Sequence, residues 1–221
     1  MRPILALNFK TFETSTGNNA VQLAKLADEF AQKSNFEVIL APAYSDLRAV
    51  ASVATHCSIY SQHVDPVEYG QFTGYFPVPV AAAICKGTLL NHNEKKLSFK
   101  ILGDTVKLCK KYSFQTILCA DNLAEAKRIS ALEPYMIAIE LPELIGSGKS
   151  LTNVNPELAE QIAKQLKRIT KKTKSKLLMG AGVSTAQDLQ KAIELGLDGV
   201  LLASAFAKNK NPKKWLQGFL L

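Results

Sequence analysis

Short apolar runs recur along the chain and alternate with longer stretches in which apolar residues follow helical spacing. A continuous run such as Tyr135 to Ile139 is typical of a strand buried on both faces. Runs of this kind predict eight strands, over residues 4–9, 36–41, 57–61, 87–90, 115–119, 135–139, 176–179 and 198–202.

The stretches between these runs predict amphipathic helices. Asn155-Pro156 marks one helix start, with proline at the first helical position, and Ser184 is the expected cap of a helix that Gly196 closes. The predicted helices cover residues 19–32, 45–54, 80–84, 98–112, 123–132, 156–170, 184–195 and 212–220.

This alternation of strands and helices indicates an α/β fold with parallel pairing. Eight units of this size predict a closed (β/α)8 barrel, with residues 1–221 as a single domain. A doubly wound open sheet is the competing fold, and it is disfavoured because no G-x-G-x-x-G motif follows the first strand.

The composition is that of an ordinary globular protein, with 47% hydrophobic and 21% charged residues. The N-terminal apolar run, residues 4–7, is too short for a signal peptide, and no stretch reaches membrane-spanning length. The four cysteines form no CxxC pair, which favours reduced thiols in a cytoplasmic protein without membrane partners.

The formal charge of +8 raises the question of a nucleic-acid partner. Much of the excess lies in Lys164 to Lys176 and in Lys208 to Lys214. In the first segment the lysines occupy the polar side of an amphipathic helix, so a solvated helix face is favoured over a binding patch. The same positive field would also attract a small anionic substrate.

Polar residues stand where several predicted strands end, and in a barrel these ends face one shared mouth. Glu140 directly follows the run 135–139, and Asn8 and Lys10 end the first strand. His92 and Glu94 follow the fourth strand. The sequence thus brings together a candidate base, an imidazole, an ammonium and an amide.

Small residues follow the last two strands. Gly180 to Gly182 and Ala203-Ser204 suit a phosphate held by backbone N–H groups, in the usual place for one in this fold. No carboxylates and histidines have metal-ligand spacing, so neither a metal nor a cofactor is expected. The predicted chemistry is proton transfer next to a carbonyl on a small phosphorylated molecule.

Six motifs, in order across nearly the whole chain, give it a resemblance to the triosephosphate isomerase family in its shorter archaeal form. Taken together they are highly specific. They are LNFKT (7–11), QHVD with FTG (62–65 and 72–74), TLLNHNE (88–94), AIELPELIG (138–146), GAGV (180–183) and GVLLAS (199–204).

The resemblance implies a TIM barrel that interconverts dihydroxyacetone phosphate and D-glyceraldehyde 3-phosphate through an enediolate, in glycolysis and gluconeogenesis. Glu140 would be the base, and His92 the electrophile that polarises the carbonyl. Lys10 would offset negative charge, Asn8 would hold substrate oxygens, and Glu94 would be a second carboxylate near Lys10.

The resemblance also implies a phosphate site and a lid. The phosphate-binding residues would be Ile145, Gly146, Gly180, Gly182, Ala203 and Ser204. The lid would include Leu141, Pro142, Glu143, Leu144, Ser147 and Gly148, and its closure would keep water from the intermediate.

Three positions depart from the family pattern. Leu141 replaces a proline that stiffens the lid, which predicts a looser lid and a slower enzyme. Asn93 replaces a serine that partners the free base. Lys95 and Lys96 stand where an arginine is common, so an ion-pair network is rebuilt or lost.

Residues 62–79 resemble the loop that inserts into a neighbouring subunit, with Thr73 reaching that subunit's Lys10. A homo-oligomer, either a dimer or a tetramer, is therefore expected. Tyr69 and Phe72 are interpreted as interface packing, and His63 as part of the loop's own hydrogen-bond network.

Two other functions compete with this interpretation. Another phosphate-binding barrel, such as a sugar-phosphate epimerase or an indoleglycerol-phosphate synthase relative, would share the small residues after the last two strands. It would not share Asn8 with Lys10, His92 and Glu140 on three strands. A basic, non-catalytic barrel that binds nucleic acid would need no Glu140 and would bind with steep salt dependence.

Overall fold

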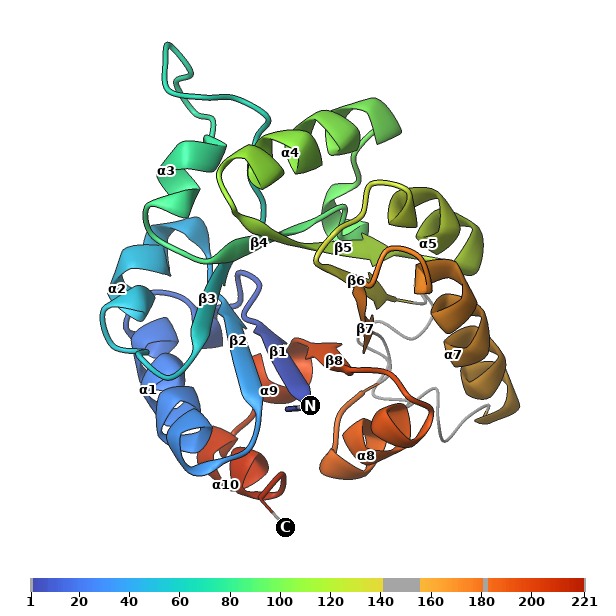
Figure 1. The fold of residues 1–221 in the computed structure, drawn as a ribbon. Coiled ribbons are helices and arrows are strands. Elements are labelled where there is room, and N and C mark those ends of the chain that lie inside the picture. The colour runs from blue at the N-terminus through green and yellow to red at the C-terminus, as the bar shows by residue number, and fades with distance from the viewer. Residues whose placement is uncertain (1, 141–155, 181–182, 221) are drawn as a thin grey trace.

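The strands form a closed parallel barrel in the order β1 to β8, in which β1 pairs with both β2 and β8 (Figure 1). This computed structural model describes residues 2–140, 156–180 and 183–220. The strands are β1 Ile4–Asn8, β2 Glu37–Ala41, β3 Ser58–Ser61, β4 Gly87–Leu90, β5 Gln115–Ala120, β6 Met136–Ile139, β7 Lys176–Met179 and β8 Gly199–Leu202. The predicted (β/α)8 barrel is confirmed.

Helices surround the barrel and connect its strands (Figure 1). They are α1 Asn18–Lys33, α2 Leu47–Ala51, α3 Val78–Ala82, α4 Phe99–Lys111, α5 Leu123–Ser130, α7 Pro156–Thr170, α8 Ala186–Glu194, α9 Ser204–Ala207 and α10 Pro212–Gln217. Short 3-10 helices cover η1 Glu13–Ser15, η2 Tyr44–Asp46 and η3 Asn93–Lys95. Among the described residues, no helix is both long and apolar enough to cross a membrane.

Alternate residues of each strand face the inside of the barrel and the surrounding helices. In β1, Ile4 and Ala6 belong to the inner apolar cluster, whereas Leu5 and Leu7 belong to the outer one. Because side chains alternate with a period of two, the next inward position of β1 is Asn8, at the carboxyl end of the strand. The barrel core thus leads directly to a polar residue at its mouth.

Tyr60 fills part of the barrel interior and is fully buried. Its hydroxyl donates a hydrogen bond to Gln115 Oε1 at the beginning of β5. A Cβ added to Gly87 would lie 2.4 Å from Cε1 of this ring, so the absence of a side chain at Gly87 makes room for the tyrosine.

Several helix predictions need correction: the helix predicted over 80–84 is α3 at 78–82, the helix predicted over 212–220 ends at Gln217, and α9 was not predicted. The N-cap of α8 is Thr185 and not Ser184, because Thr185 and Asp188 form a reciprocal capping box. The helix predicted over 45–54 is shorter, since η2 occupies residues 44–46 and α2 ends at Ala51.

Candidate active site

Three buried polar side chains lie at the carboxyl end of the barrel. Asn8 is 6% exposed, His92 is 8% exposed and Glu140 is 4% exposed. Asn8 and Glu140 continue the inward register of β1 and β6, and His92 is the second residue after β4. Buried polar groups require hydrogen-bond partners or have a functional role.

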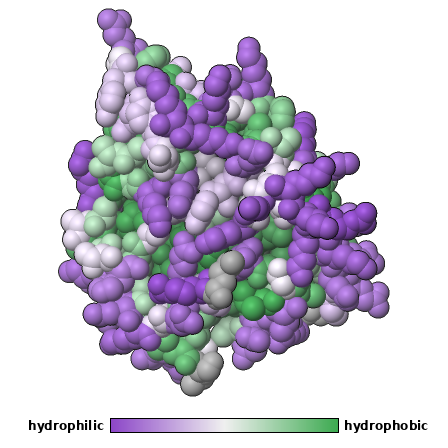
Figure 2. Space-filling model, viewed as in Figure 1, coloured by the Kyte–Doolittle hydropathy of each residue, from purple (hydrophilic) through white to green (hydrophobic). Residues whose placement is uncertain are grey.

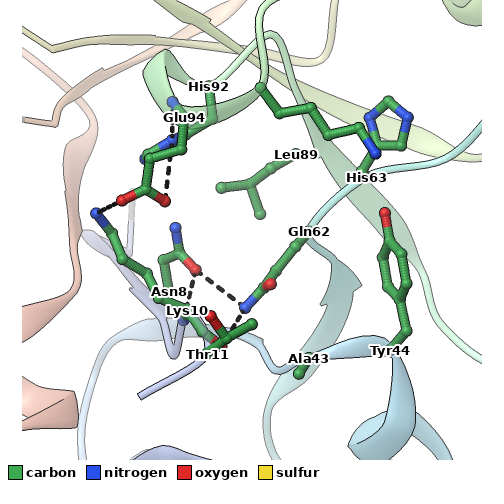
Figure 3. Close-up of a pocket in the computed structure, with 11 residues that line it drawn as sticks. Asn8, Lys10, Thr11, Ala43, Tyr44, Gln62, His63, Leu89, His92 and Glu94 are labelled. Carbon is green, nitrogen blue, oxygen red and sulfur yellow. Dashed lines mark hydrogen bonds and ion pairs between the residues drawn. The ribbon is translucent and has the colours of Figure 1, made fainter.

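Asn8 is held so that its amide nitrogen remains available. Its Oδ1 accepts hydrogen bonds from the backbone N–H of Lys10 at 3.0 Å and from Gln62 Nε2 at 3.3 Å. Gln62 Nε2 also donates to the carbonyl oxygens of Lys10 and Ala41, at 2.9 and 3.0 Å. Two donors at Oδ1 fix the orientation of the amide, and Figure 3 shows Nδ2 pointing toward the side of the cavity with Leu89.

Lys10 adopts a left-handed backbone conformation with φ of 52°, which is unfavourable for a side chain with a Cβ. Its Nζ lies 2.6 Å from Glu94 Oε1, and the lysine side chain is largely buried (Figure 3). The strained backbone and the ion pair together hold an ammonium group at the cavity.

His92 is fixed in one neutral tautomer. The backbone N–H of Glu94 donates to Nδ1 at 3.1 Å, so Nδ1 has a free lone pair and the proton is on Nε2. Burial, assisted by the nearby Lys10 ammonium, lowers the pKa of His92 below its ordinary value. Its Nε2 lies 3.6 Å from Glu140 Oε2. The ring therefore presents an N–H donor beside Glu140.

Glu140 has an environment suited to a base. Burial raises its pKa to about 7, and the Cys119 thiol hydrogen bond and the Lys10 ammonium act in the opposite direction. Its Oε2 has no hydrogen-bond partner in the part of the chain that the structure describes. A buried carboxylate oxygen without a partner, titrating near neutral pH, can accept a proton from a bound molecule.

Gly180 makes room for this carboxylate. A Cβ at this position would lie 2.4 Å from Glu140 Cγ and 3.0 Å from the carbonyl oxygen of Ile139. The N–H of Gly180 donates to that same oxygen at 2.7 Å. Gly180 therefore contributes free space beside the base, while its N–H is used within the barrel.

Ala203 and Ser204 lie at the beginning of the short helix α9, after β8. The first N–H groups of a helix have no acceptor within that helix, which makes the position suitable for an anion. The other predicted phosphate residues, Ile145, Gly146 and Gly182, lie outside the described residues. The predicted lid also lies outside them, namely Leu141, Pro142, Glu143, Leu144, Ser147 and Gly148.

A cavity of about 240 Å³ opens beside these groups. It is lined by the predicted residues Asn8, Lys10, His92 and Glu94. Sequence analysis did not assign site roles to the remaining lining residues, although Gln62 was recognisable as a strand-end position. They are Thr11, Ala43, Tyr44, Gln62, His63, Leu89 and Lys95.

Asn93 forms no hydrogen bond with Glu140 among the described residues. Its Nδ2 donates to Asp121 Oδ2 at 3.5 Å, and Cys119 hydrogen-bonds the base instead. Lys96 forms ion pairs with Asp121 at 2.7 Å and Glu125 at 3.0 Å. Lys96 therefore takes part in an ion-pair network at this position.

Thr73 lies on the segment between β3 and α3, which projects beyond the ring of helices (Figure 1). It is exposed and is not among the residues that line the cavity of its own chain. His63 hydrogen-bonds Asp65 at 3.3 Å within this segment, in agreement with its interpretation as part of the loop network.

Comparison with known proteins gives one consistent family. A family model described as triosephosphate isomerase matches residues 3–218. Triosephosphate isomerases of Methanocaldococcus jannaschii, Methanothermus fervidus and Saccharolobus solfataricus are 37%, 38% and 39% identical to this chain. These matches cover 94%, 98% and 99% of this chain, and 94%, 96% and 95% of the respective relatives.

Proposed function

This chain belongs to the triosephosphate isomerase family, and from that premise we propose how its residues interconvert dihydroxyacetone phosphate and D-glyceraldehyde 3-phosphate. It is an aldose–ketose isomerase, whose reaction belongs to glycolysis. Neither the epimerase-like barrel nor the nucleic-acid-binding barrel is favoured by the comparisons.

Glu140 is the base that moves the proton between C1 and C2. The single observation that carries this role is its buried carboxylate, whose pKa is raised to about 7 by burial and whose Oε2 lacks a partner among the described residues. A base is most effective when its pKa lies near the working pH, because it is then both ionised and basic.

His92 and Lys10 stabilise the charge that develops on the substrate oxygens. The neutral His92 ring donates from Nε2 to the carbonyl oxygen, and the ammonium of Lys10 offsets the enediolate charge. Asn8 donates from Nδ2 to a substrate oxygen, since its Oδ1 is already occupied. Glu94 holds the Lys10 ammonium in place.

The phosphate binds on the other side of the mouth, at the N–H groups of Ala203 and Ser204, together with Gly146 and Gly182. Helix N-termini favour anions because their N–H groups are unpaired within the helix. The beginning of α9 supports this placement.

The enzyme works as a cytoplasmic homo-oligomer, in gluconeogenesis as well as in glycolysis. Free cysteines are typical of a reducing compartment, and all four in this chain are free. The projecting loop with exposed Tyr69 and Tyr75 supports assembly, with Thr73 reaching Lys10 of the neighbouring subunit.

Isomerisation of D-glyceraldehyde 3-phosphate by the wild type and Glu140→Asp, between pH 5 and 9, tests the proposal. The wild-type kcat/KM should rise as the pH increases through about 7, because Glu140 must be ionised to accept a proton. Shortening the side chain by one methylene should lower kcat about a hundredfold. A folded but inactive wild type would overturn the assignment.

A further inference from the structure

The loop that carries His92, residues 91–97, is tied together by one buried amide. Asn91 is 2% exposed and has a left-handed backbone with φ of 59°. Its Oδ1 accepts from the N–H of Leu97 at 3.1 Å, so the amide joins the two ends of the loop. Its Nδ2 donates to the carbonyl oxygen of Cys119 at 2.9 Å and to Glu125 Oε1 at 2.8 Å.

Glu125, in the first turn of α5, connects this amide to the next strand end. Its Oε1 accepts from Asn91, while its Oε2 accepts from the N–H of Asp121 at 2.8 Å and from Lys96 Nζ at 3.0 Å. The backbone hydrogen bond from Asp121 and the bonds from Asn91 and Lys96 outweigh burial and lower the pKa of Glu125. One ionised carboxylate therefore holds both ends of the His92 loop to the turn after β5.

Lys96 and Asp121, which both contact Glu125, lie within electrostatic range of His92 and Glu140. The positive charge of Lys96 lowers the pKa of His92 and of Glu140, and the negative charge of Asp121 raises both. Cys119, whose carbonyl accepts from Asn91, hydrogen-bonds the Glu140 carboxylate through its thiol. A shift of loop 91–97 would consequently change the position of the His92 imidazole relative to the Glu140 carboxylate.

We propose that Glu125 is a positioning residue for the isomerisation. Through Asn91 and Lys96 it holds loop 91–97, and with it the His92 ring, in register with Glu140. The inference rests on the proposed function, since it assigns Glu125 a part in the alignment of that same site. Glu125 itself does not line the cavity.

Two single variants and their combination test this proposal by steady-state isomerisation of D-glyceraldehyde 3-phosphate. Glu125→Gln keeps the shape but directs an amide NH2 toward N–H donors. Asn91→Gly keeps the left-handed backbone, which glycine adopts without strain, and deletes the amide. Each should lower kcat about tenfold to a hundredfold, with KM changed less than about twofold.

The double variant separates a shared role from two independent ones. Glu125 and Asn91 act through the same set of hydrogen bonds. The kcat of the double variant should therefore be only slightly below that of the less active single variant. Multiplicative losses would overturn the proposal. As a matched control, Glu133→Gln removes an exposed carboxylate paired with Lys110 at 3.3 Å and should leave kcat unchanged.

Histidine-ring ¹⁵N spectra provide a readout that is independent of turnover, and the chain has only three histidines to assign. In the wild type, His92 should give the signal of one neutral Nε2–H tautomer, and in Glu125→Gln that signal should shift or split. If Glu125→Gln had the kcat of the wild type and an unchanged His92 signal, this inference would be wrong and the proposed function would stand. That holds even if the variant unfolds at a lower temperature. An inactive wild type would overturn the proposed function together with this inference.

Discussion

Glu140 depends on a neighbour that has no side chain. Gly180 adjoins it across the β6–β7 pairing, and a Cβ there would lie 2.4 Å from Glu140 Cγ. Gly180→Ala should therefore push the carboxylate out of line with the substrate and lower kcat/KM about a hundredfold, since small displacements of a catalytic group have large effects on rate. Steady-state kinetics with D-glyceraldehyde 3-phosphate would measure the change.

Gly103→Ala is the matched control for that substitution. A Cβ at Gly103, in α4, would meet Leu132 Cδ2 at 3.6 Å, an ordinary contact. Alanine in a helix should raise the free energy of unfolding by about 0.5–1 kcal/mol without changing kcat/KM. If Gly180→Ala retained wild-type kcat/KM, the carboxylate would have room that the structure does not show.

At the residue scale, the sequence predicted which side chains lie together at the mouth of the barrel, but not their protonation states or their hydrogen bonds. Their place at the ends of predicted strands was sufficient to put Asn8 and Glu140 at the mouth. The contact between the Cys119 thiol and Glu140 depends on the register of β5 against β6, with Cys119 opposite Ala138. No local pattern encodes that register. The raised pKa of Glu140 follows from burial, and the Cys119 thiol acts against it.

Between elements, one buried carboxylate joins α1 to the segment before β3. Asp28 accepts from the N–H groups of His56 at 2.6 Å and Cys57 at 3.1 Å, and from His56 Nδ1 at 2.9 Å. Burial by itself would raise the pKa of Asp28, but the hydrogen bonds from His56 outweigh it and the net pKa is lowered. The ionised form therefore stabilises the fold.

Asp28→Asn should lower the free energy of unfolding by about 1–3 kcal/mol at pH 7, because buried N–H donors lose a charged acceptor. For a carboxyl group whose pKa is lowered on folding, this stabilisation is present above the unfolded value, 3.8, and is lost as the pH falls through the folded value. The difference between variant and wild type should therefore persist from pH 7 to 5 and shrink below pH 4.

Urea unfolding at pH 7 and pH 3 would measure both differences. Asp104→Asn, which changes an exposed carboxylate on α4, is the control and should behave as the wild type at both values. An Asp28→Asn deficit of the same size at pH 3 and pH 7 would contradict an ionic origin.

Helices with a long periodic pattern were predicted well, and short helices were predicted less well. The helix predicted over 98–112 is α4, because its apolar face repeats over several turns. Helix α9 was missed because four residues within a run of small and apolar side chains show no period. The cap of α8 was misplaced by one residue, since Ser184 and Thr185 are equally good caps and only the reach of Asp188 decides between them.

At the scale of the whole molecule, the loop between β3 and α3 projects from the barrel, and hydrogen bonds hold its base. We call this loop the arm. Its base is fixed by Asp65, whose N–H donates to the carbonyl of Phe76 at 2.9 Å and whose Oδ2 accepts from the N–H of Phe76 at 2.7 Å. Toward the tip, Tyr69 is 69% exposed and Phe72 is 39% exposed. A fixed arm with exposed aromatic side chains is typical of a surface that a partner covers.

In the proposed assembly, the surface that receives this arm lies around the cavity of another copy. Thr11, Tyr44 and Lys95 line the outer part of the cavity, next to Lys10, and Tyr44 is itself 44% exposed. The space-filling view also shows apolar patches between the charged side chains of the face it presents (Figure 2). If the arm of one copy occupies the cavity of another, each active site is completed only by assembly. The pattern of strands along one chain does not predict such an assembly.

Tyr69→Asp combined with Phe72→Asp should therefore convert the assembly to monomers. The two substitutions add charges where a dry contact is expected, so association should weaken by at least about 2 kcal/mol, or more than tenfold in Kd. Each single chain should remain folded, because both side chains are exposed in it. If Thr73 contacts Lys10 of the neighbouring copy as proposed, kcat should fall as the assembly dissociates. Sedimentation velocity and kinetics on the same samples would show both changes.

Leu220→Asp is the control, because Leu220 is an apolar residue outside the arm and is 45% exposed. This variant should leave mass and kcat unchanged. A wild type that sediments as a fully active monomer would show that the arm has another role.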